Sequence, residues 1–243
     1  MKTIILSGIL LAAQAVSAQD KSNIQSSLKT VGELIGTATA DQVKTRFNEP
    51  TDELISPESH LLLYKLRADS TQFLFKFGGD RKLRSFTLDD QRKRPLAQLQ
   101  YAKAKEARSS SSKDEILAKL GYPQQVIIEG TRETWYYKFG NKPLGEKNIV
   151  VDYSPSQPQV VKNFKYYADL NNSATFTSDI ISLIKKGMSG LDDIEKELGE
   201  PTKVLMSATR ENWYYISGQS TLVVYFDNQS KVKDYLFSKK AKE

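Results

Sequence analysis

Thr131-Arg-Glu-Thr-Trp-Tyr-Tyr137 and Thr209-Arg-Glu-Asn-Trp-Tyr-Tyr215 are two nearly identical stretches of this chain. Each follows a Gly-x-Pro triplet, at Gly121–Pro123 and at Gly199–Pro201, and in both copies the Trp comes 12 residues after the Pro. The two copies are offset by 78 residues. Self-similarity at a fixed period is typical of repeat architectures, so the pattern predicts tandem structural units.

A weaker third copy comes earlier in the chain. Asn48-Glu49-Pro50 is followed by Leu62-Leu63-Tyr64 at the same spacing. We therefore expect three repeats, each with two helices and a three-stranded antiparallel sheet, which is an α+β fold. The expected divisions are a signal peptide at 1–18, a divergent first repeat at 19–90, a second at 91–170 and a third at 171–243.

Helical spacing of apolar residues marks the first helix of each repeat. The expected stretches are Ile24 to Leu34, Pro95 to Arg108 and Ile180 to Ile184. The second helix is short and begins after a small polar cap, expected at Thr39, Ser112 and Ser189.

Each second helix is expected to end on a left-handed backbone, which Gly adopts freely and Asn tolerates. Gly121 and Gly199 hold that position in two repeats, and Asn48 holds it in the first. The Pro two residues later cannot continue a helix. The physical requirement is therefore kept although the residue changes.

Three strands are expected after each second helix. The first contains 62–64, 135–137 and 213–215; the second 73–77, 149–153 and 222–226; the third 83–88, 161–166 and 232–237. Alternation predicts that one face of each sheet packs on the helices. The residues expected on that face are Phe73, Phe75, Phe77, Trp135, Tyr137, Trp213, Tyr215, Leu222, Val224 and Phe226. The other face stays open and carries Leu63, Leu74, Tyr136, Val150, Tyr214, Val223 and Tyr225.

A resemblance to a known family enters in the third repeat. Lys186-Gly187-Met188-Ser189, an apolar helix, Leu198-Gly199-Glu200-Pro201, Trp213-Tyr214-Tyr215 and Val224-Tyr225-Phe226-Asp227 together resemble the SmpA/OmlA (BamE) domain. The same two-helix, three-strand plan underlies the β-lactamase inhibitory protein (BLIP-like) fold. The resemblance is weaker in the second repeat and weakest in the first. It implies an α+β fold and a binding role outside the cytoplasm, and it assigns no functional residue here.

The N-terminus has the pattern of a secretory signal. Lys2 precedes the apolar stretch Ile4 to Ala15, and Val16-Ser17-Ala18 is a small-residue cleavage site. The apolar stretch is shorter than the roughly 20 residues of a transmembrane helix. We expect an exported protein, periplasmic or secreted, with no transmembrane segment.

Composition narrows the possible chemistry. The chain has no cysteine, which excludes disulfides, thiol catalysis and a lipid-bearing cysteine. Its formal net charge is +6, with basic clusters at 81–84, 92–94 and 239–242. These clusters are either solvated surface or a site of attraction to anionic lipid or acidic protein. No nucleic-acid motif, metal-ligand cluster or cofactor loop occurs, so none of these partners is expected.

Charged residues near the aromatic strands have ordinary interpretations. His60, the only histidine, is expected at a surface strand end rather than as a catalytic base. Glu133 and Glu211 stand at the matching position, next to Arg132 and Arg210, and are interpreted as hairpin-edge charges.

The sequence favours an exported, non-enzymatic protein-binding module. Tyr136, Tyr214, Leu63 and Tyr225 are the expected contact residues, because tyrosines on an exposed sheet face are typical interface hot spots. One alternative is an envelope-assembly accessory that contacts anionic lipid or a β-barrel machine. Another is a hydrolase with an unrecognised site. The open face could also cover a neighbouring repeat.

Overall fold

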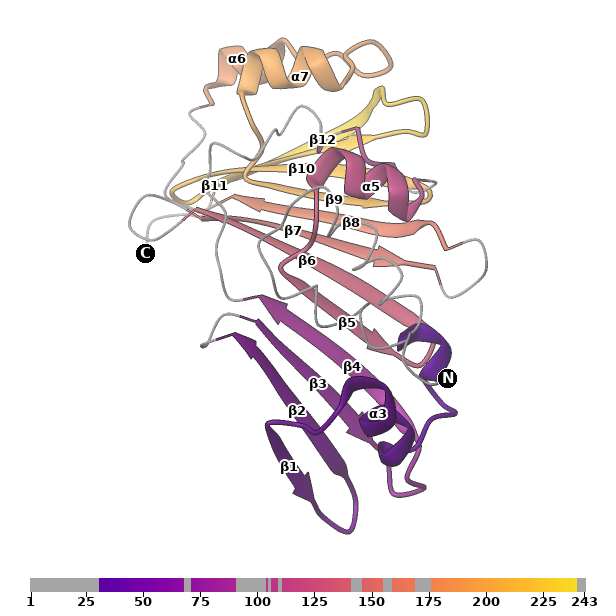
Figure 1. Cartoon of the computed structure of the whole chain (residues 1–243). Helices are drawn as coiled ribbons and strands as arrows, with labels where there is room; N and C mark the ends of the chain where they lie inside the picture. The colour runs from indigo at the N-terminus through magenta and orange to yellow at the C-terminus, as the bar shows by residue number, and fades with distance from the viewer. Residues whose placement is uncertain are drawn as a thin grey trace. The chain divides into compact units, whose positions relative to one another are not determined.

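The structure, a computed structural model, describes residues 31–67, 71–90, 104, 106–108, 111–140, 146–154, 159–168 and 176–239. It is mostly β, with a few short helices and antiparallel strands ordered as in the chain, from β1 to β12 (Figure 1). The chain divides into two compact units: unit 1 holds 1–92 and 124–135, and unit 2 holds 93–123 and 136–243. The expected signal peptide, most of the helices expected at 24–34 and 95–108, and the basic residues at 92–94 and 240–242 lie outside the described residues.

Unit 1 contains one complete helix and five complete strands among its described residues. They are α3 (Ala40–Phe47), β1 (Asp52–Ile55), β2 (His60–Arg67), β3 (Thr71–Phe77), β4 (Leu83–Asp90) and β5 (Gln125–Glu129). The next strand, β6 (Arg132–Gly140), begins in unit 1 and ends in unit 2. Residues 31–34 of unit 1, the end of the helix expected from Ile24 to Leu34, are also helical.

Unit 2 contains the remaining described helices and strands. They are α5 (Lys113–Leu120), β7 (Glu146–Tyr153), β8 (Val161–Ala168), α6 (Ser178–Ser182), α7 (Leu191–Leu198), β9 (Lys203–Ser207), β10 (Arg210–Ser217), β11 (Ser220–Phe226) and β12 (Val232–Lys239).

Four strands, not the expected three, follow each of α3, α5 and α7. The additional strands are β1, β5 and β9, each of which begins two residues after the Pro that follows the helix. In β9, Val204 pairs with Trp213, and Met206 pairs with Glu211. The three-strand prediction was wrong because stretches of four or five residues beside a Pro look like loops until a partner strand supplies their hydrogen bonds. The fold is therefore richer in strand than the α+β prediction; the division into three repeats stays a prediction.

Two of the three predicted N-caps of the second helices are confirmed. The hydroxyls of Thr39 and Ser112 accept hydrogen bonds from the backbone three residues on, as N-caps do. In α7, Gly190 is the N-cap instead, and the carboxylate of Asp193 accepts its N–H at 2.8 Å. Ser189 lies one residue too early, and its hydroxyl accepts the N–H of Lys185.

The helix ends differ from the predicted left-handed conformation in one angle. Asn48, Gly121 and Gly199 have φ of 69°, 73° and 75°, but their ψ values are −165°, −156° and −165°. This region is populated almost only by Gly, so Asn48 is under backbone strain. The extended ψ directs the chain from the helix toward the first strand.

A tyrosine holds each helix end. The hydroxyls of Tyr64, Tyr137 and Tyr215 donate to the carbonyl oxygens of Asn48, Gly121 and Gly199 at 2.9, 3.1 and 3.2 Å. In all three cases the tyrosine comes 16 residues after its acceptor. Within each unit, the end of each of these helices therefore lies on the sheet face that carries its tyrosine, which we call the inner face.

The inner face forms the core, as the alternation predicted. Phe75, Phe77, Trp213 and Tyr215 are fully buried, as are the equivalent residues of β6 and β11. In unit 1, Phe47 of α3 packs against Phe75 with ring centroids 4.9 Å apart. In unit 2, Trp213 packs against Phe226 at 5.2 Å. The alternate residues of each strand point to the opposite side of the sheet, which we call the outer face.

Candidate protein-binding surface

Two tyrosines and a lysine form a row across the outer face of unit 2. Tyr167 of β8 lies opposite Lys203 of β9, which in turn lies opposite Tyr214 of β10. The Lys203 ammonium is 5.6 Å from the ring centroid of Tyr167 and 4.9 Å from that of Tyr214. We call these three residues the tyrosine–lysine row. Directly opposite residues share a sheet face, so the row is a consequence of register.

The ammonium of Lys203 has aromatic neighbours on two sides. Each cation–π contact contributes about 0.5–1 kcal/mol at an exposed site. Among the described residues, no carboxylate lies within ion-pair distance of Lys203. By contrast, Lys165, two residues before Tyr167, forms an ion pair with Asp152 at 3.3 Å. The row therefore places the positive charge of a half-buried lysine next to two tyrosine rings.

Tyr225 extends the row toward β11. Tyr214 pairs with Val223, and Asn212 pairs with Tyr225, so the two tyrosines are diagonal neighbours on the outer face. Diagonal neighbours remain within reach of aromatic side chains. Both tyrosines are half-buried, whereas Val223 between them is 7% exposed. The structure thus brings together two of the predicted contact residues.

The other two predicted contact residues lie elsewhere. Tyr136 is half-buried on β6, where it enters unit 2. Leu63 belongs to unit 1, where it lies opposite Asp52 of β1 and Leu74 of β3. Leu63 is half-buried, and Leu74 is 36% exposed. The outer face therefore carries apolar residues in both units, but the described cation–π contacts on this face are in unit 2.

Sequence reasoning missed Tyr167 and Lys203. Lys203 lies on β9, a strand that was not predicted, so its partners could not be assigned. Tyr167 did carry a signal: in β8, Phe164 and Tyr166 are buried, so alternation turns Tyr167 outward. Tyr167 is 36% exposed, as that pattern requires.

Two glutamates that were interpreted as edge charges are buried. Glu133 and Glu211 are 5% and 8% exposed, and their carboxylates accept the indole N–H of Trp135 and Trp213 at 2.7 and 2.9 Å. Burial raises the pKa of Glu211, an effect that the Arg108 guanidinium 3.8 Å away partly offsets. The prediction was wrong because the indole N–H needs an acceptor once the Trp is buried.

His60 is also buried, at 7% exposed, rather than at a surface strand end. Its Nε2 lies 2.6 Å from a carboxylate oxygen of Glu53, and its ring lies 5.5 Å from that of Phe77. Lys44 binds the same carboxylate at 2.7 Å. Hydrogen bonds from Lys44 and His60 lower the pKa of Glu53. The geometry pairs His60 with a carboxylate on the inner face beside α3.

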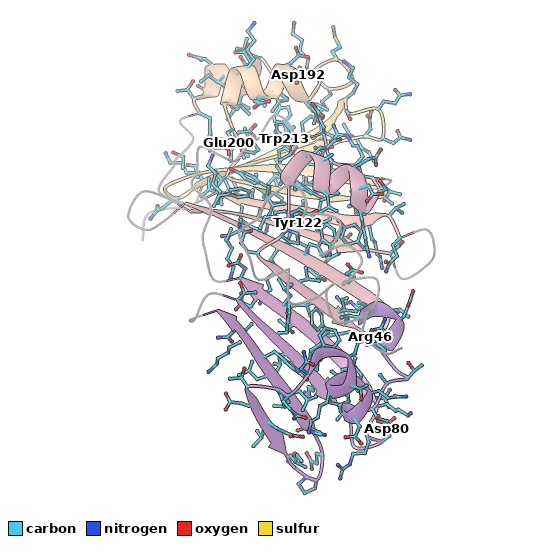
Figure 2. The ribbon with its side chains drawn as sticks, viewed as in Figure 1. Arg46, Asp80, Tyr122, Asp192, Glu200 and Trp213 are labelled. Carbon is cyan, nitrogen blue, oxygen red and sulfur yellow. The ribbon has the colours of Figure 1, made fainter. Side chains whose placement is uncertain are left out.

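Charged side chains form further local pairs in unit 2 (Figure 2, where Glu200 and Trp213 are labelled). Glu200 accepts from Lys147 at 2.6 Å and from the hydroxyl of Tyr166.

In the part of the chain that the structure describes, no three His, Asp or Glu side chains gather as a metal site would require. No helix there is long and apolar enough to cross a membrane.

Comparison with known proteins leaves the family open. No protein-family model matches the sequence, and no curated protein matches it. Among solved structures, the chain is similar to a "putative beta-lactamase inhibitor protein" from Streptococcus mutans, with a TM-score of 0.34 and 13% identity over 57% of this chain and 94% of that one.

A second solved structure is also similar. It is a DUF4309 family protein (YjgB) from Bacillus subtilis, with a TM-score of 0.21 and 15% identity over 59% of this chain and 95% of that one. Similarity at this level says nothing about what this chain binds.

Proposed function

We propose that this chain is an exported, non-enzymatic module that binds another protein through the outer face of unit 2. The contact surface is the tyrosine–lysine row together with Tyr225. The observation that supports the proposal is Lys203, held between the rings of Tyr167 and Tyr214 with no described carboxylate in ion-pair distance. An isolated surface lysine would be solvated, whereas this one is held in position by two large apolar surfaces.

Such a surface has the chemistry of a protein-binding hot spot. Tyrosines bury much area while losing little side-chain entropy, and a cation with free donors adds specificity and speeds encounter. The half-buried state of Tyr214 and Tyr225 matters, because side chains already packed along one edge lose less freedom on binding. The partner then covers the exposed ring edges.

The direct test uses the partner captured from envelope extract by the mature chain and then purified. Tyr214→Ala combined with Tyr225→Ala should weaken its binding in titration calorimetry by about 2 kcal/mol or more per residue, as hot-spot truncations do. Leu74→Ala is the control, since it removes an exposed apolar side chain from the outer face of unit 1. We expect this control to bind like the parent.

Three outcomes would overturn the proposal. Unchanged affinity with unchanged melting temperature would show that the outer face of unit 2 is not the contact surface. A large fall in melting temperature would show that the two tyrosines are structural. Binding to phosphatidylglycerol vesicles at the strength of the protein partner would instead favour the lipid-contacting envelope accessory.

A further inference from the structure

The fourth strand of each repeated segment, β4, β8 or β12, begins in the same way. The N–H of its first residue donates to the loop before the second helix: Leu83 to Ala38 at 2.9 Å, Val161 to Ser111 at 2.8 Å, and Val232 to Ser189 at 2.8 Å. Each first residue also pairs with the preceding strand across a register shift. These shared contacts align the three strands residue by residue.

The later residues of β4 and β8 pair with the next strand along the chain. In unit 1, the stretch 85–89 of β4 pairs with β5, with Phe86 opposite Ile128 and Thr87 opposite Ile127. In unit 2, the stretch 163–167 of β8 pairs with β9, with Phe164 opposite Met206 and Lys165 opposite Leu205. Both junctions are antiparallel and have the same register.

The equivalent stretch of β12, residues 234–238, has no such partner among the described strands. The consequence appears in the side chains. Phe86 and Phe164 are 2% and 3% exposed, and Tyr166 is fully buried. In β12 the equivalent residues are half-exposed Tyr235 and 46% exposed Phe237, and Leu236 between them is 56% exposed. Phe176 contacts one side of the Phe237 ring, at 5.9 Å.

At the other end of the strand order, β1 is the counterpart of β5 and β9. Glu53 pairs with Leu62 as Val204 pairs with Trp213, so Leu54 corresponds to Leu205. β1 pairs with β2, and no described strand pairs with its other edge. Its apolar side chains remain in solvent, with Leu54 63% and Ile55 58% exposed. An unprotected edge with exposed apolar residues is a template for pairing with another strand.

We infer that β12 of one copy pairs with β1 of a second copy, in the register of the β4–β5 and β8–β9 junctions. That register places Leu236 opposite Leu54 on the outer face and Tyr235 opposite Ile55 on the inner face. It therefore covers the most exposed apolar side chains of both edges at once. The same register places Lys239 beside Asp52, so charge also favours this direction.

The occupant is a second copy because the chain already contains both halves of the junction. The internal junctions show that a first strand of this sequence type fits a fourth strand of this type. The contact is heterologous, since the two edges differ, so it leaves a free edge at each end of the assembly. A junction of five residue pairs is small, so association is weak and depends on concentration.

Sedimentation velocity across a dilution series of the mature chain tests the inference. The parent should increase in average mass with concentration. Leu54→Lys and Leu236→Lys should each weaken that association at least about tenfold, because a charge then faces the partner's leucine. Leu74→Lys is the matched control: Leu74 is an exposed leucine of β3, which pairs with β2 on one side and with β4 on the other, so it lies on neither edge. Circular dichroism confirms that each variant is folded.

A mixture of the two edge variants gives the sharpest result. Leu54→Lys keeps an intact β12, and Leu236→Lys keeps an intact β1, so the mixture should form a one-to-one dimer and stop there. A parent that stays monomeric throughout would overturn the inference. So would a Leu54→Lys variant that associates like the parent, because that result assigns pairing to β12 with itself. A mixture that remains monomeric would also overturn it.

Discussion

The environment of Trp213 in β10 and that of Leu62 in β2 are two versions of one arrangement. Both residues are fully buried, and both come two residues before the tyrosine that holds a helix end. At Trp213 the polar partner is Glu211 on the same strand. At Leu62 no indole is present, and His60, at the position of Glu211, pairs instead with Glu53 of the neighbouring strand.

The difference shows that the inner face of both units carries a paired carboxylate, but at different positions. In unit 2 an indole N–H donates to the carboxylate, which is buried. In unit 1 a lysine and an imidazole bind it in a more exposed position, with 29% of the side chain accessible. A buried polar group must find a partner, and either arrangement supplies one.

The largest effect should follow removal of the indole. Trp213→Ala should lower the free energy of unfolding by about 3–5 kcal/mol, because it leaves a cavity and removes the donor to buried Glu211. Leu62→Ala should cost about 2–4 kcal/mol, since it removes less volume and no hydrogen bond. Urea denaturation measures both variants. Melting of Trp213→Ala that coincides with the parent would contradict the inner-face assignment.

Helix ends offer the next comparison, between Asn48 and Gly199. Gly199→Asn should cost less than Gly199→Val, because Asn48 already adopts nearly the same backbone angles in spite of the strain there. Gly199→Val should cost about 1–3 kcal/mol through backbone strain. No atom lies within 4 Å of where the added Cβ would stand, so crowding at that atom does not contribute to this cost. Equal losses for Asn and Val in chemical denaturation would remove the argument.

A smaller effect is expected from the three tyrosine hydroxyls. Tyr64→Phe, Tyr137→Phe and Tyr215→Phe should each cost about 1 kcal/mol, the usual net contribution of one hydrogen bond. The three changes should be similar, because the hydroxyls make the same bond at similar lengths. Thermal unfolding of the single variants is the measurement, and one variant well outside the range of the others would break the equivalence of the helix ends.

The smallest effects are expected in the pH dependence, where the two carboxylates should have opposite signs. The pKa of Glu211 is raised by burial, so its favourable contribution is present below the unfolded pKa of 4.5 and lost as pH rises through the folded value. Glu211→Gln should therefore gain stability relative to the parent as pH rises.

The pKa of Glu53 is lowered by Lys44 and His60, so its contribution is present above 4.5 and lost on acidification. Glu53→Gln should therefore lose stability relative to the parent as pH rises. Urea unfolding from about pH 3 to about pH 7 follows both variants. If the stability difference between variant and parent changed in the same direction with pH for both variants, the two carboxylates would be equivalent.

Much of the fold could be predicted from local patterns. The spacing from Gly121 to Tyr137 and from Gly199 to Tyr215 located the helix ends and the strands after them, because helix stops and alternation are properties of short stretches. The aromatic residues Phe75, Trp213 and Tyr215 were assigned to the buried face correctly. Asn48 showed that the backbone requirement extends to the divergent first copy.

Features that depend on register could not be predicted in this way. Strands β1, β5 and β9 are too short to be distinguished from loops, and only their pairing partners make them strands. The position of Lys203 between Tyr167 and Tyr214 depends on the register of three strands, which places these residues directly opposite one another. The burial of Glu211 and His60 depends on what packs above them.

The sequence by itself therefore determined the repeated pattern, the helix stops and the alternation of buried and exposed residues, because each is set by neighbours in the chain. Only the tertiary structure decided which residues lie opposite one another across strands. That choice places the tyrosine–lysine row on the outer face and leaves the apolar edges of β1 and β12 exposed. Cross-strand contacts join residues far apart in sequence, and no local pattern records them.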